Sequence, residues 1–353
     1  MTRPPDRPLR AGIAGITGYT GYELYRLLQA HPGVEVVRLS AGRGAGAPLE
    51  QSWAALSGRS HPAVESLTVD WARGLDVVFL ALPHGISGGY VATLHSEGVL
   101  VPNRQSDGLR VIDLGADFRL KDPAVYEATY GGAHPCPKLL ADAVYGLPER
   151  HRDELLGAVL VANPGCYPTA TALGAQVLLA AGCAGPVHAT CVSGVSGAGR
   201  RAGPRTLFCE VHDSAVAYGV GGSHRHVPEM EQALNVPVMF TPHLVSMNRG
   251  MLATVSMSAP VALQTARLQE VAADMYADEA LIVIRDSPPA TRDVRGTGLA
   301  HVQVVVDEQR HVAQALVAID NVGKGAAAQA VQNLNVVFGL AETTGIPTIP
   351  LVP

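Results

Sequence analysis

The sequence predicts an α/β protein with two domains: a doubly wound parallel sheet, followed by an α+β domain whose sheet is mostly antiparallel. Three observations support this prediction. The chain has 353 residues, enough for two domains of about 150 residues each. Apolar residues make up 47% of it and charged residues only 16%, so it can bury a large core. Apolar runs alternate with helical patterns in the first half, as they do around a parallel sheet.

The first half opens with a strand–helix–strand unit. The apolar run 9–16 predicts a buried strand, and 22–30 predicts a helix that is closed by a His-Pro-Gly turn. Further strands are predicted at 34–40, 77–82, 111–114 and 159–162, and a further helix after Gly85 that runs to Ser96. We therefore expect a Rossmann-type domain over residues 1–165.

The pattern changes after about residue 185. Strands are predicted at 188–193, 238–241, 250–259, 301–306 and 311–321, with one clear helix within 263–281. Few helices separate these strands, which favours an α+β domain over residues 166–324. The Ala/Gln/Asn-rich stretch 325–338 predicts a last helix, and we expect 325–353 to pack back against the first domain.

Composition excludes several classes of function. The net charge is −5 and no basic stripe occurs, which argues against nucleic-acid binding. No apolar run reaches the length of a membrane span, and Met1 to Arg10 lacks the apolar centre of a signal peptide. The five cysteines form no CxxC pair, so we expect a reducing, cytoplasmic environment.

A glycine-rich loop follows the first predicted strand and opens the first predicted helix. Gly15, Gly18 and Gly21 form GxxGxxG, a variant of the dinucleotide fingerprint. Glycines there let the backbone approach a pyrophosphate, while the helix N-terminus supplies N–H donors. A tight turn without a ligand is the alternative. The next strand ends in Ser40, with Arg43 nearby and no carboxylate before Glu50, so NADP(H) is favoured over NAD(H).

Cys166 stands in the run Asn163-Pro164-Gly165-Cys166-Tyr167-Pro168, before an apolar helical stretch. A thiol at or beside a helix N-terminus forms the nucleophilic thiolate more easily, because the unsatisfied N–H groups favour a negative charge. The alternative is a small buried side chain at a turn. Together with a nicotinamide cofactor, an activated cysteine suggests aldehyde or acyl-phosphate chemistry through a thioester.

Thioester chemistry needs a proton donor and acceptor near the sulfur. The run Ser223-His224-Arg225-His226-Val227-Pro228-Glu229 follows a glycine-rich loop, and two histidines around an arginine favour acid–base work by His224 or His226. The sequence does not order these two histidines, although we prefer His226. Zinc is the other use of such a pair, but no third ligand is spaced convincingly, so we expect no metal.

A phosphate-bearing substrate also needs anion donors. The Gly/Ser-rich loop 193–201 ends in two arginines and could contact nicotinamide, phosphate or both. His243, Arg249 and Arg119 are further candidates, since all stand beside Gly/Pro turns at predicted strand ends.

These motifs together resemble the N-acetyl-γ-glutamyl-phosphate reductases of arginine biosynthesis, in the semialdehyde dehydrogenase group. The resemblance covers residues 10 to about 340. The matching runs are Gly15–Gly21, Ile112–Arg119, Tyr145–Glu149, Asn163–Thr169, Ser193–Arg200, His224–Glu229, His243–Gly250 and Lys324–Asn333. The resemblance implies a cytoplasmic, homo-oligomeric, NADPH-dependent reductase, either a dimer or a tetramer.

The expected site residues lie on these runs. Cofactor contacts are expected at Gly15, Thr17, Gly18, Tyr19, Thr20, Gly21, Ser40, Arg43, Pro83, Ser196, Gly197 and Asn333. Substrate contacts are expected at Arg119, Asn163, Arg200, Arg225, Glu229, His243 and Arg249.

The predicted reaction reduces N-acetyl-glutamyl 5-phosphate to the 5-semialdehyde with release of phosphate. Two alternatives stay open. One is a reductase for a carrier-linked aminoadipyl phosphate of lysine biosynthesis, one methylene longer, a difference worth only about 1–3 kcal/mol of discrimination. The other is a non-catalytic NADP-sensing protein, against which the intact cysteine and the His-Arg-His run argue.

Overall fold

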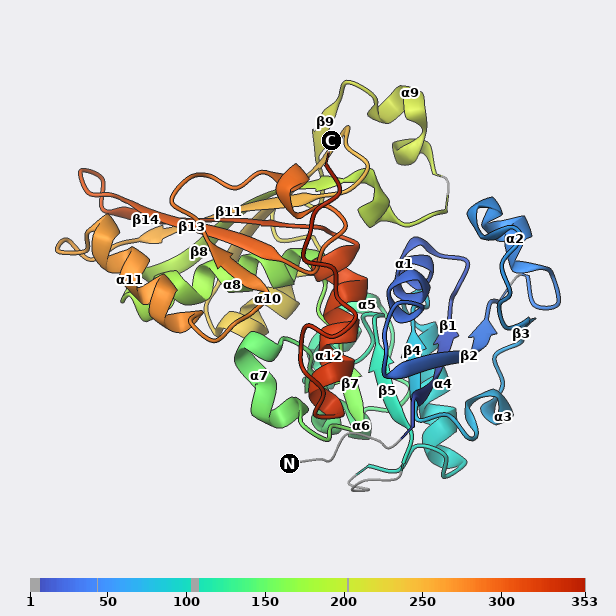
Figure 1. Ribbon diagram of the computed structural model, residues 1–353. Coiled ribbons are helices and arrows are strands. Elements are labelled where there is room, and N and C mark those ends of the chain that lie inside the picture. The colour runs from blue at the N-terminus through green and yellow to red at the C-terminus, as the bar shows by residue number, and fades with distance from the viewer. Residues whose placement is uncertain (1–6, 43, 103–107, 202, 353) are drawn as a thin grey trace. The chain divides into compact units, whose positions relative to one another are not determined.

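The computed structural model describes residues 7–42, 44–102, 108–201 and 203–352 (Figure 1). Contacts divide the chain into two units. The first comprises residues up to Pro164 together with Ala326–Ile346, and the second comprises Gly165–Gly325 together with the residues from Pro347 onward.

The first unit contains a parallel sheet. Within the described residues it has seven strands in the order β3-β2-β1-β4-β5-β7-β6. They are β1 (Leu9–Ala14), β2 (Val34–Ser40), β3 (Val64–Glu65), β4 (Val77–Leu80), β5 (Arg110–Asp113), β6 (Val144–Tyr145) and β7 (Leu160–Ala162). All neighbouring strands are parallel, which confirms the predicted doubly wound sheet. The strand order reverses between β1 and β4, where ligands of such sheets bind.

Helices cover this sheet. They are α1 (Tyr19–Leu28), α2 (Leu49–Ser52), α3 (Val69–Ala72), α4 (Ile86–Ser96), α5 (Pro123–Tyr130), α6 (Lys138–Asp142), α7 (Pro148–Leu155) and α12 (Ala328–Val337). Helix α12 lies against α1 and α7 (Figure 1), and every one of its residues is buried. It is preceded by a π-helical turn, Gly323–Ala327.

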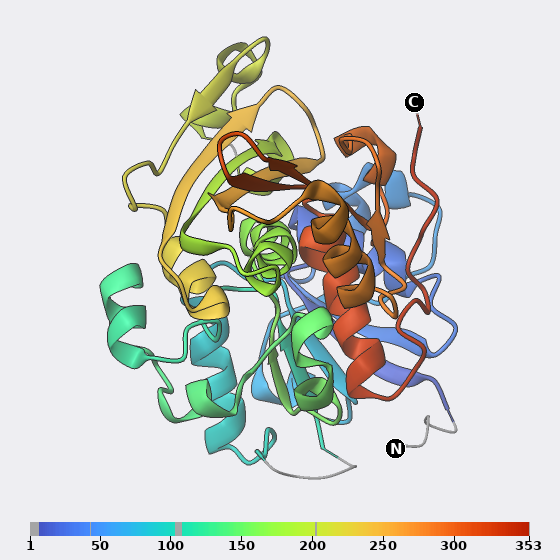
Figure 2. The ribbon, with the colours of Figure 1, turned by 90° about the vertical axis from the view of Figure 1, so that its left-hand side faces the viewer.

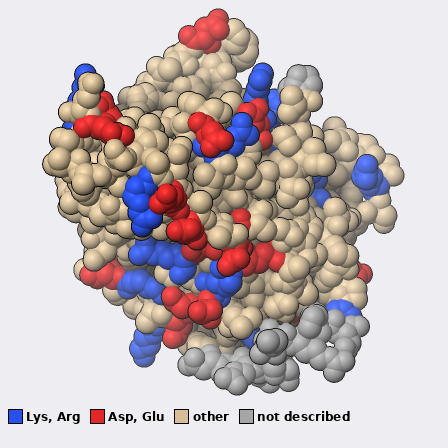
Figure 3. Space-filling view, turned by 60° about the vertical axis from the view of Figure 1, so that its left-hand side comes forward, with Lys and Arg blue, Asp and Glu red and all other residues tan. Residues whose placement is uncertain are grey.

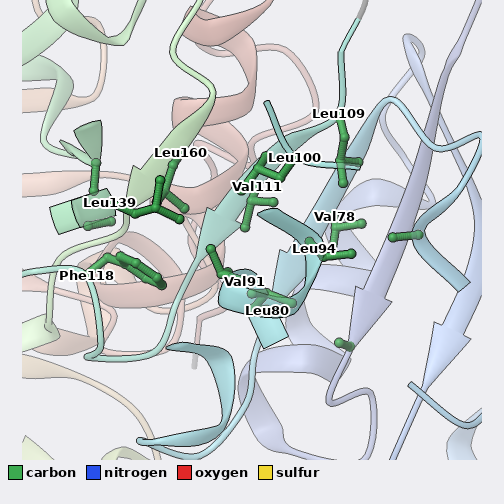
Figure 4. Packing of buried hydrophobic residues seen from close by; sticks show 14 of the residues in the cluster. Val78, Leu80, Val91, Leu94, Leu100, Leu109, Val111, Phe118, Leu139 and Leu160 are labelled. Carbon is green, nitrogen blue, oxygen red and sulfur yellow. The ribbon is translucent and has the colours of Figure 1, made fainter. Parts of the chain in front are cut away.

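A cluster of apolar side chains forms one core of this unit between the central strands and α4. Strand β4 is Val-Val-Phe-Leu with all four residues buried, as expected of a strand covered on both faces. Figure 4 shows the cluster, whose labelled members are Val78, Leu80, Val91, Leu94, Leu100, Leu109, Val111, Phe118, Leu139 and Leu160.

The second unit contains a mixed sheet. Its strands, in the described residues, are ordered β12-β13-β14-β11-β8-β10-β9. They are β8 (Ala184–Gly194), β9 (Ala215–Ala217), β10 (Val238–Val245), β11 (Met251–Ser258), β12 (Ile282–Ile284), β13 (Ala300–Asp307) and β14 (Val312–Ile319). The β8–β10 and β12–β13 pairs are parallel and the others antiparallel, which confirms the predicted α+β domain with a mostly antiparallel sheet.

Four helices of the described residues belong to this unit: α8 (Cys166–Ala180), α9 (Phe208–Val211), α10 (Val227–Leu234) and α11 (Thr265–Met275). Helix α8 lies across β11 and β14 (Figure 2). Its Gly174 lets the backbone come close to the sheet, because a Cβ there would lie 3.1 Å from side-chain atoms of Ala315 and Val317. This packing fixes the start of α8.

Residues 203–217, which we call the arm, extend beyond the edge of the second sheet and carry α9 and β9 (Figure 1). Strand β9 pairs with the end of β10. Leu207 and Phe208 are exposed. The sequence analysis predicted no element here, because these short segments show no periodicity.

The chain end differs from the expectation that 325–353 packs wholly on the first domain. The residues from Pro347 onward group with the second unit. There the Leu351 backbone N–H donates to the Arg295 carbonyl, and the Leu351 carbonyl accepts from the Arg295 guanidinium. No helix in the described part of the chain is long and apolar enough to cross a membrane.

On the face in Figure 3, acidic and basic side chains are interspersed, so this face carries no extended patch of one sign.

Candidate active site

Cys166 is the first residue of α8. Gly165 precedes it as the N-cap with extended backbone (φ −68°, ψ 152°), and no side chain among the described residues caps the helix from that position. Helix α8 includes Pro168 in its first turn, where the missing proline N–H has no helical partner to lose. The thiol therefore sits at the positive end of a 15-residue helix.

Glu229 holds the turn that presents this thiol. It is 1% exposed, on α10, and its Oε1 accepts a 2.8 Å hydrogen bond from the Gly165 backbone N–H. Glu229, a predicted substrate contact, thus holds the residue before Cys166 in place.

The turn before α12 also touches Cys166. A Cβ built on Gly325 would lie 2.7 Å from the Cys166 Cβ, so this position requires glycine. Gly325 is held there by a 2.9 Å hydrogen bond to the Asp320 carbonyl. The Asp320 carboxylate accepts bonds from the Gly296, Val322 and Gly323 backbone N–H groups and pairs with Arg249 at 2.9 Å.

A cavity of about 910 Å³ opens at the Cys166 end of α8. It brings together five of the predicted residues: Cys166, Gly197, His224, Arg225 and His226. The arm forms another part of its wall. The remaining lining residues are Tyr167, Ser193, Ala198, Pro204, Arg205, Thr206, Leu207, Glu210, Ser214, Val216, Ala217, Tyr218, Gly219 and Leu244.

The two histidines have different surroundings. His224 Nδ1 accepts a 3.1 Å bond from the His226 backbone N–H, so the proton of the neutral ring is on Nε2. Burial first, and then the neighbouring Arg225 charge, lower the pKa of His224 to about 4. His224 is therefore a neutral N–H donor at physiological pH.

His226 is 6% exposed and immediately precedes α10. Its ring lies 4.8 Å from the His224 ring and 6.0 Å from the Tyr167 ring, measured between centroids. The backbone N–H of His226 donates to His224 Nδ1, whereas the His226 imidazole lines the cavity.

Some of the predicted substrate residues make hydrogen bonds or ion pairs within the protein. Arg249 pairs with the buried Asp320. Arg119 donates to the Asn163 and Leu114 carbonyls at 2.8 and 2.9 Å, and so braces the end of β7. Arg200 is exposed and His243 half-buried on β10. None of these four lies among the described residues that line the cavity.

The glycine loop in the first unit fits a dinucleotide. Close packing explains Gly15 and Gly21: a Cβ on Gly15 (φ 94°) would lie 2.1 Å from the Ala81 carbonyl oxygen, and one on Gly21 2.2 Å from that of Gly15. Gly18 has no neighbour closer than 3.5 Å to such a Cβ. In the described residues no side chain caps α1, so its first N–H groups suit an anion.

The other predicted cofactor residues of this unit surround the same loop. Trp53 donates to the Ile16 carbonyl, and its ring makes tilted contacts with the rings of Tyr19 and Tyr22. Ser40 is the last residue of β2, 1% exposed, and its carbonyl accepts from Gly15. Arg43 lies outside the described residues.

Asp117, which was not among the predicted site residues, anchors the loop between β4 and α4, and this loop contains Pro83. Asp117 accepts bonds from the Gly85 and Gly88 backbone N–H groups and from the Ser87 hydroxyl, all within 3.1 Å. His84 Nδ1 lies 2.6 Å from it. The signal in the sequence was a second carboxylate, Asp117, four residues beyond Asp113 at the end of β5.

The remaining predicted residues are tied into buried networks. Asn333 donates to the Gly146 carbonyl and to Asn163 Oδ1, both at 2.9 Å, within the first unit. In the second unit, Ser196 Oγ accepts from Asn321 at 2.9 Å. No group of three or more His, Cys, Asp or Glu residues in the described part of the chain is placed to hold a metal ion.

Two family models match the chain. The model for "Semialdehyde dehydrogenase, NAD binding domain" matches residues 10–158, and that for "Semialdehyde dehydrogenase, dimerisation domain" matches 166–321. The boundary between them falls at the residues just before Cys166, where the two units divide.

Curated relatives match over almost the whole chain. The N-acetyl-gamma-glutamyl-phosphate reductase of Halorhodospira halophila is 46% identical and covers 98% of this chain and 100% of its own. The enzyme of the same name from Dehalococcoides mccartyi is 41% identical, with 98% and 99% covered.

Solved structures share the fold at low identity. Aspartate semialdehyde dehydrogenase II from Vibrio cholerae has a TM-score of 0.67 at 19% identity, covering 94% of this chain and 98% of its own. Aspartate semialdehyde dehydrogenase with NADP from Candida albicans has a TM-score of 0.63 at 16% identity, covering 94% and 100%.

Proposed function

The chain belongs to the N-acetyl-gamma-glutamyl-phosphate reductase family, and from this premise we propose that it converts N-acetyl-glutamyl 5-phosphate to N-acetyl-glutamate 5-semialdehyde and phosphate with NADPH. One observation carries the proposal beyond the family name: Cys166 opens α8 at a cavity lined by both His224 and His226. A thiol at a helix N-terminus, beside two imidazoles, has the parts that acyl transfer to sulfur requires.

The first unit would hold the cofactor. The α1 N-terminus and the open face of Gly18 would take the pyrophosphate, and Ser40, with no carboxylate at the end of β2, leaves room for a 2′-phosphate. The other predicted contacts of the cofactor stay predictions; they are Thr17, Tyr19, Thr20, Pro83, Ser196, Gly197, Asn333 and Arg43. When bound, NADPH supplies the hydride.

Cys166 forms and later releases the covalent intermediate. Its thiolate attacks the acyl carbon, the C–O bond to phosphate breaks, and phosphate leaves with the bonding electron pair. After the thioester is reduced, the thiohemiacetal oxyanion re-forms the carbonyl, the C–S bond breaks, and the aldehyde leaves as the thiolate is restored. The α8 N-terminus stabilises the thiolate at both ends of this cycle.

The structure supports different roles for the two histidines. His224 is neutral with its proton on Nε2, so it donates a hydrogen bond and does not collect a proton. We therefore assign proton transfer to His226, which accepts the thiol proton before Cys166 attacks the substrate. The variants His224→Asn and His226→Asn should therefore differ in kcat. His226→Asn should lower kcat by about 10²-fold or more and should abolish the part of the pH–rate profile that reports the basic group.

Arg225 is the predicted arginine best placed for the substrate, because it lines the cavity and is exposed. We propose that it binds phosphate or the α-carboxylate. Arg249 and Glu229 help to hold the turns next to Cys166, and Arg119 holds the end of β7. All three stay predicted substrate contacts. Arg200, His243 and Asn163 stay predicted contacts.

The test is the reverse reaction. The purified chain is mixed with NADP⁺, phosphate and N-acetyl-glutamate semialdehyde, and NADPH absorbance is followed. We expect activity that disappears in Cys166→Ser while NADPH binding persists. Activity with a carrier-linked aminoadipate semialdehyde only, or NADPH binding with no turnover of either aldehyde, contradicts the proposal.

The dimerisation model over residues 166–321 supports a homo-oligomer. The choice between dimer and tetramer, and the cytoplasmic location, stay predictions that sedimentation and fractionation would test.

A further inference from the structure

We propose that the Tyr218 hydroxyl is a catalytic residue, which donates a hydrogen bond to the acyl oxygen of the substrate while that oxygen carries negative charge. The inference rests on the proposed function. Nothing in the family models or in the names of the relatives assigns this residue, and it stands outside the motifs that the sequence analysis used.

Tyr218 lies at the cavity and on a fixed backbone. It lines the same 910 Å³ cavity as Cys166, His224 and His226. It follows β9, and its backbone N–H donates to the Pro242 carbonyl of β10 at 3.1 Å. Its ring packs 5.5 Å from the His224 ring at an interplanar angle of 60°. The phenol is therefore held at the wall of the cavity by the second sheet.

The hydroxyl of Tyr218 meets a second hydroxyl. Tyr167 Oη lies 2.9 Å from Tyr218 Oη, so one phenol donates to the other. Burial is the first cause that raises the pKa of both phenols, so both keep their protons. The pair thus has two protons, and its mutual bond uses one of them.

The second proton needs an acceptor outside the pair. The surroundings of the two rings indicate which hydroxyl can direct its proton into the cavity. Tyr167 is 3% exposed, whereas Tyr218 is the more exposed member of the pair. The 2.9 Å contact lets either phenol donate, so Tyr167 can donate to Tyr218 when the Tyr218 proton turns to an anionic oxygen in the cavity. The pair can thus present the Tyr218 proton to the cavity and keep its mutual hydrogen bond.

A neutral donor at this position suits a developing oxyanion. Both covalent steps at Cys166 place negative charge on the former carbonyl oxygen, and a preorganised donor stabilises that charge more than it stabilises the neutral carbonyl. Tyr218 and the neutral His224 Nε2–H would form the donor pair, adjacent to each other by their ring contact.

The test compares Tyr218→Phe with Tyr167→Phe. Each variant removes one oxygen, and Tyr167 is the more deeply buried partner, so a merely structural role for the pair predicts that Tyr167→Phe does at least as much harm. We expect Tyr218→Phe to lower kcat in the reverse reaction by about 10²-fold, with KM for the aldehyde changed less than threefold. Tyr167→Phe should lower kcat less, because Tyr218 keeps its own proton.

Two further readouts separate catalysis from folding. The melting temperature and the rate of Cys166 alkylation should stay near those of the wild type in Tyr218→Phe. Wild-type kcat in Tyr218→Phe, or an equal kcat loss in Tyr167→Phe, would overturn the proposal. Failure of the wild-type chain to turn over the aldehyde would instead overturn the proposed function, so the two failures are distinct.

Discussion

At the scale of single residues, Glu229 and Cys166 share the N-terminal end of α8. Glu229 Oε1 takes the Gly165 N–H, and Cys166 is the next residue. A carboxylate there competes with the thiolate for the same positive end of the helix. Glu229 thus holds the turn in place, and we expect its charge to oppose ionisation of the thiol.

Glu229→Gln should separate these two effects. The amide keeps an oxygen that accepts from the Gly165 N–H but removes the negative charge. We expect the midpoint of Cys166 alkylation, followed against pH with iodoacetamide, to move about one pH unit lower.

The matched control is Glu231→Gln. Glu231 is on the same helix, and its Oε1 also accepts a backbone N–H, from Val238 at 3.0 Å. We expect no change in the alkylation midpoint there. An unchanged or higher midpoint in Glu229→Gln would show that Glu229 does not oppose the thiolate.

At the scale of elements, the β4–α4 loop depends on Asp117, a residue distant in sequence. Its carboxylate is fully buried and accepts from the Gly85 and Gly88 N–H groups and the Ser87 hydroxyl. The N-cap of α4 is Gly85, which has a left-handed backbone (φ 83°) and no side chain that could cap the helix. The bonds to Asp117 therefore take the place of a capping side chain at the start of α4. The loop contains Pro83 and lies at the carboxyl end of β4, beside the reversal of strand order.

Asp117→Asn should therefore weaken both stability and cofactor binding. The neutral amide presents an NH₂ to neighbours that are donors, so we expect a loss of about 2–3 kcal/mol in the free energy of unfolding. NADPH affinity, measured by the fluorescence of the cofactor, should fall as well.

Ser87→Ala is the control, since it removes one donor and leaves both backbone bonds to Asp117. Its effect should be the smaller one in both measurements. Wild-type melting and NADPH affinity in Asp117→Asn would rule out an anchoring role.

The same elements show what sequence alone could predict. Strand β2 matches its predicted bounds and β4 ends two residues early, because apolar runs between turns define strands locally. The arm was not predicted, since β9 exists through pairing with β10 and not through its own sequence. Likewise Cys166, His224 and His226 were predicted from their motifs. The position of Tyr218 at the same cavity and the hydrogen bond from Gly165 to Glu229 depend on which segments the fold brings together.

At the scale of the whole molecule, a buried carboxyl in the first sheet links stability to pH. Asp113 ends β5 and is 0% exposed. Burial first, and then the charge of Asp117, raise its pKa to about 7 from 3.8. Between about pH 4 and pH 7 the folded chain therefore binds a proton that the unfolded chain has lost, so this group's contribution to stability is complete below that window and is lost as pH rises through it.

Asp113→Asn removes this dependence. The amide has no proton to lose, so the unfolding free energy of the variant minus that of the wild type should rise between pH 4 and pH 8, by roughly 4 kcal/mol if the full shift is expressed. Burial lowers the pKa of His224, His31 and His134, so these histidines change stability with pH in the opposite direction. They are common to both proteins, so their contributions cancel in the difference.

Asp307→Asn is the control. Arg310 lowers the pKa of this exposed carboxyl, so the difference in unfolding free energy between this variant and the wild type should be flat from pH 5 to pH 8. Denaturant unfolding at three or four pH values measures both. A flat difference for Asp113→Asn would mean that the Asp113 carboxyl loses its proton at the same pH in the folded and unfolded chains.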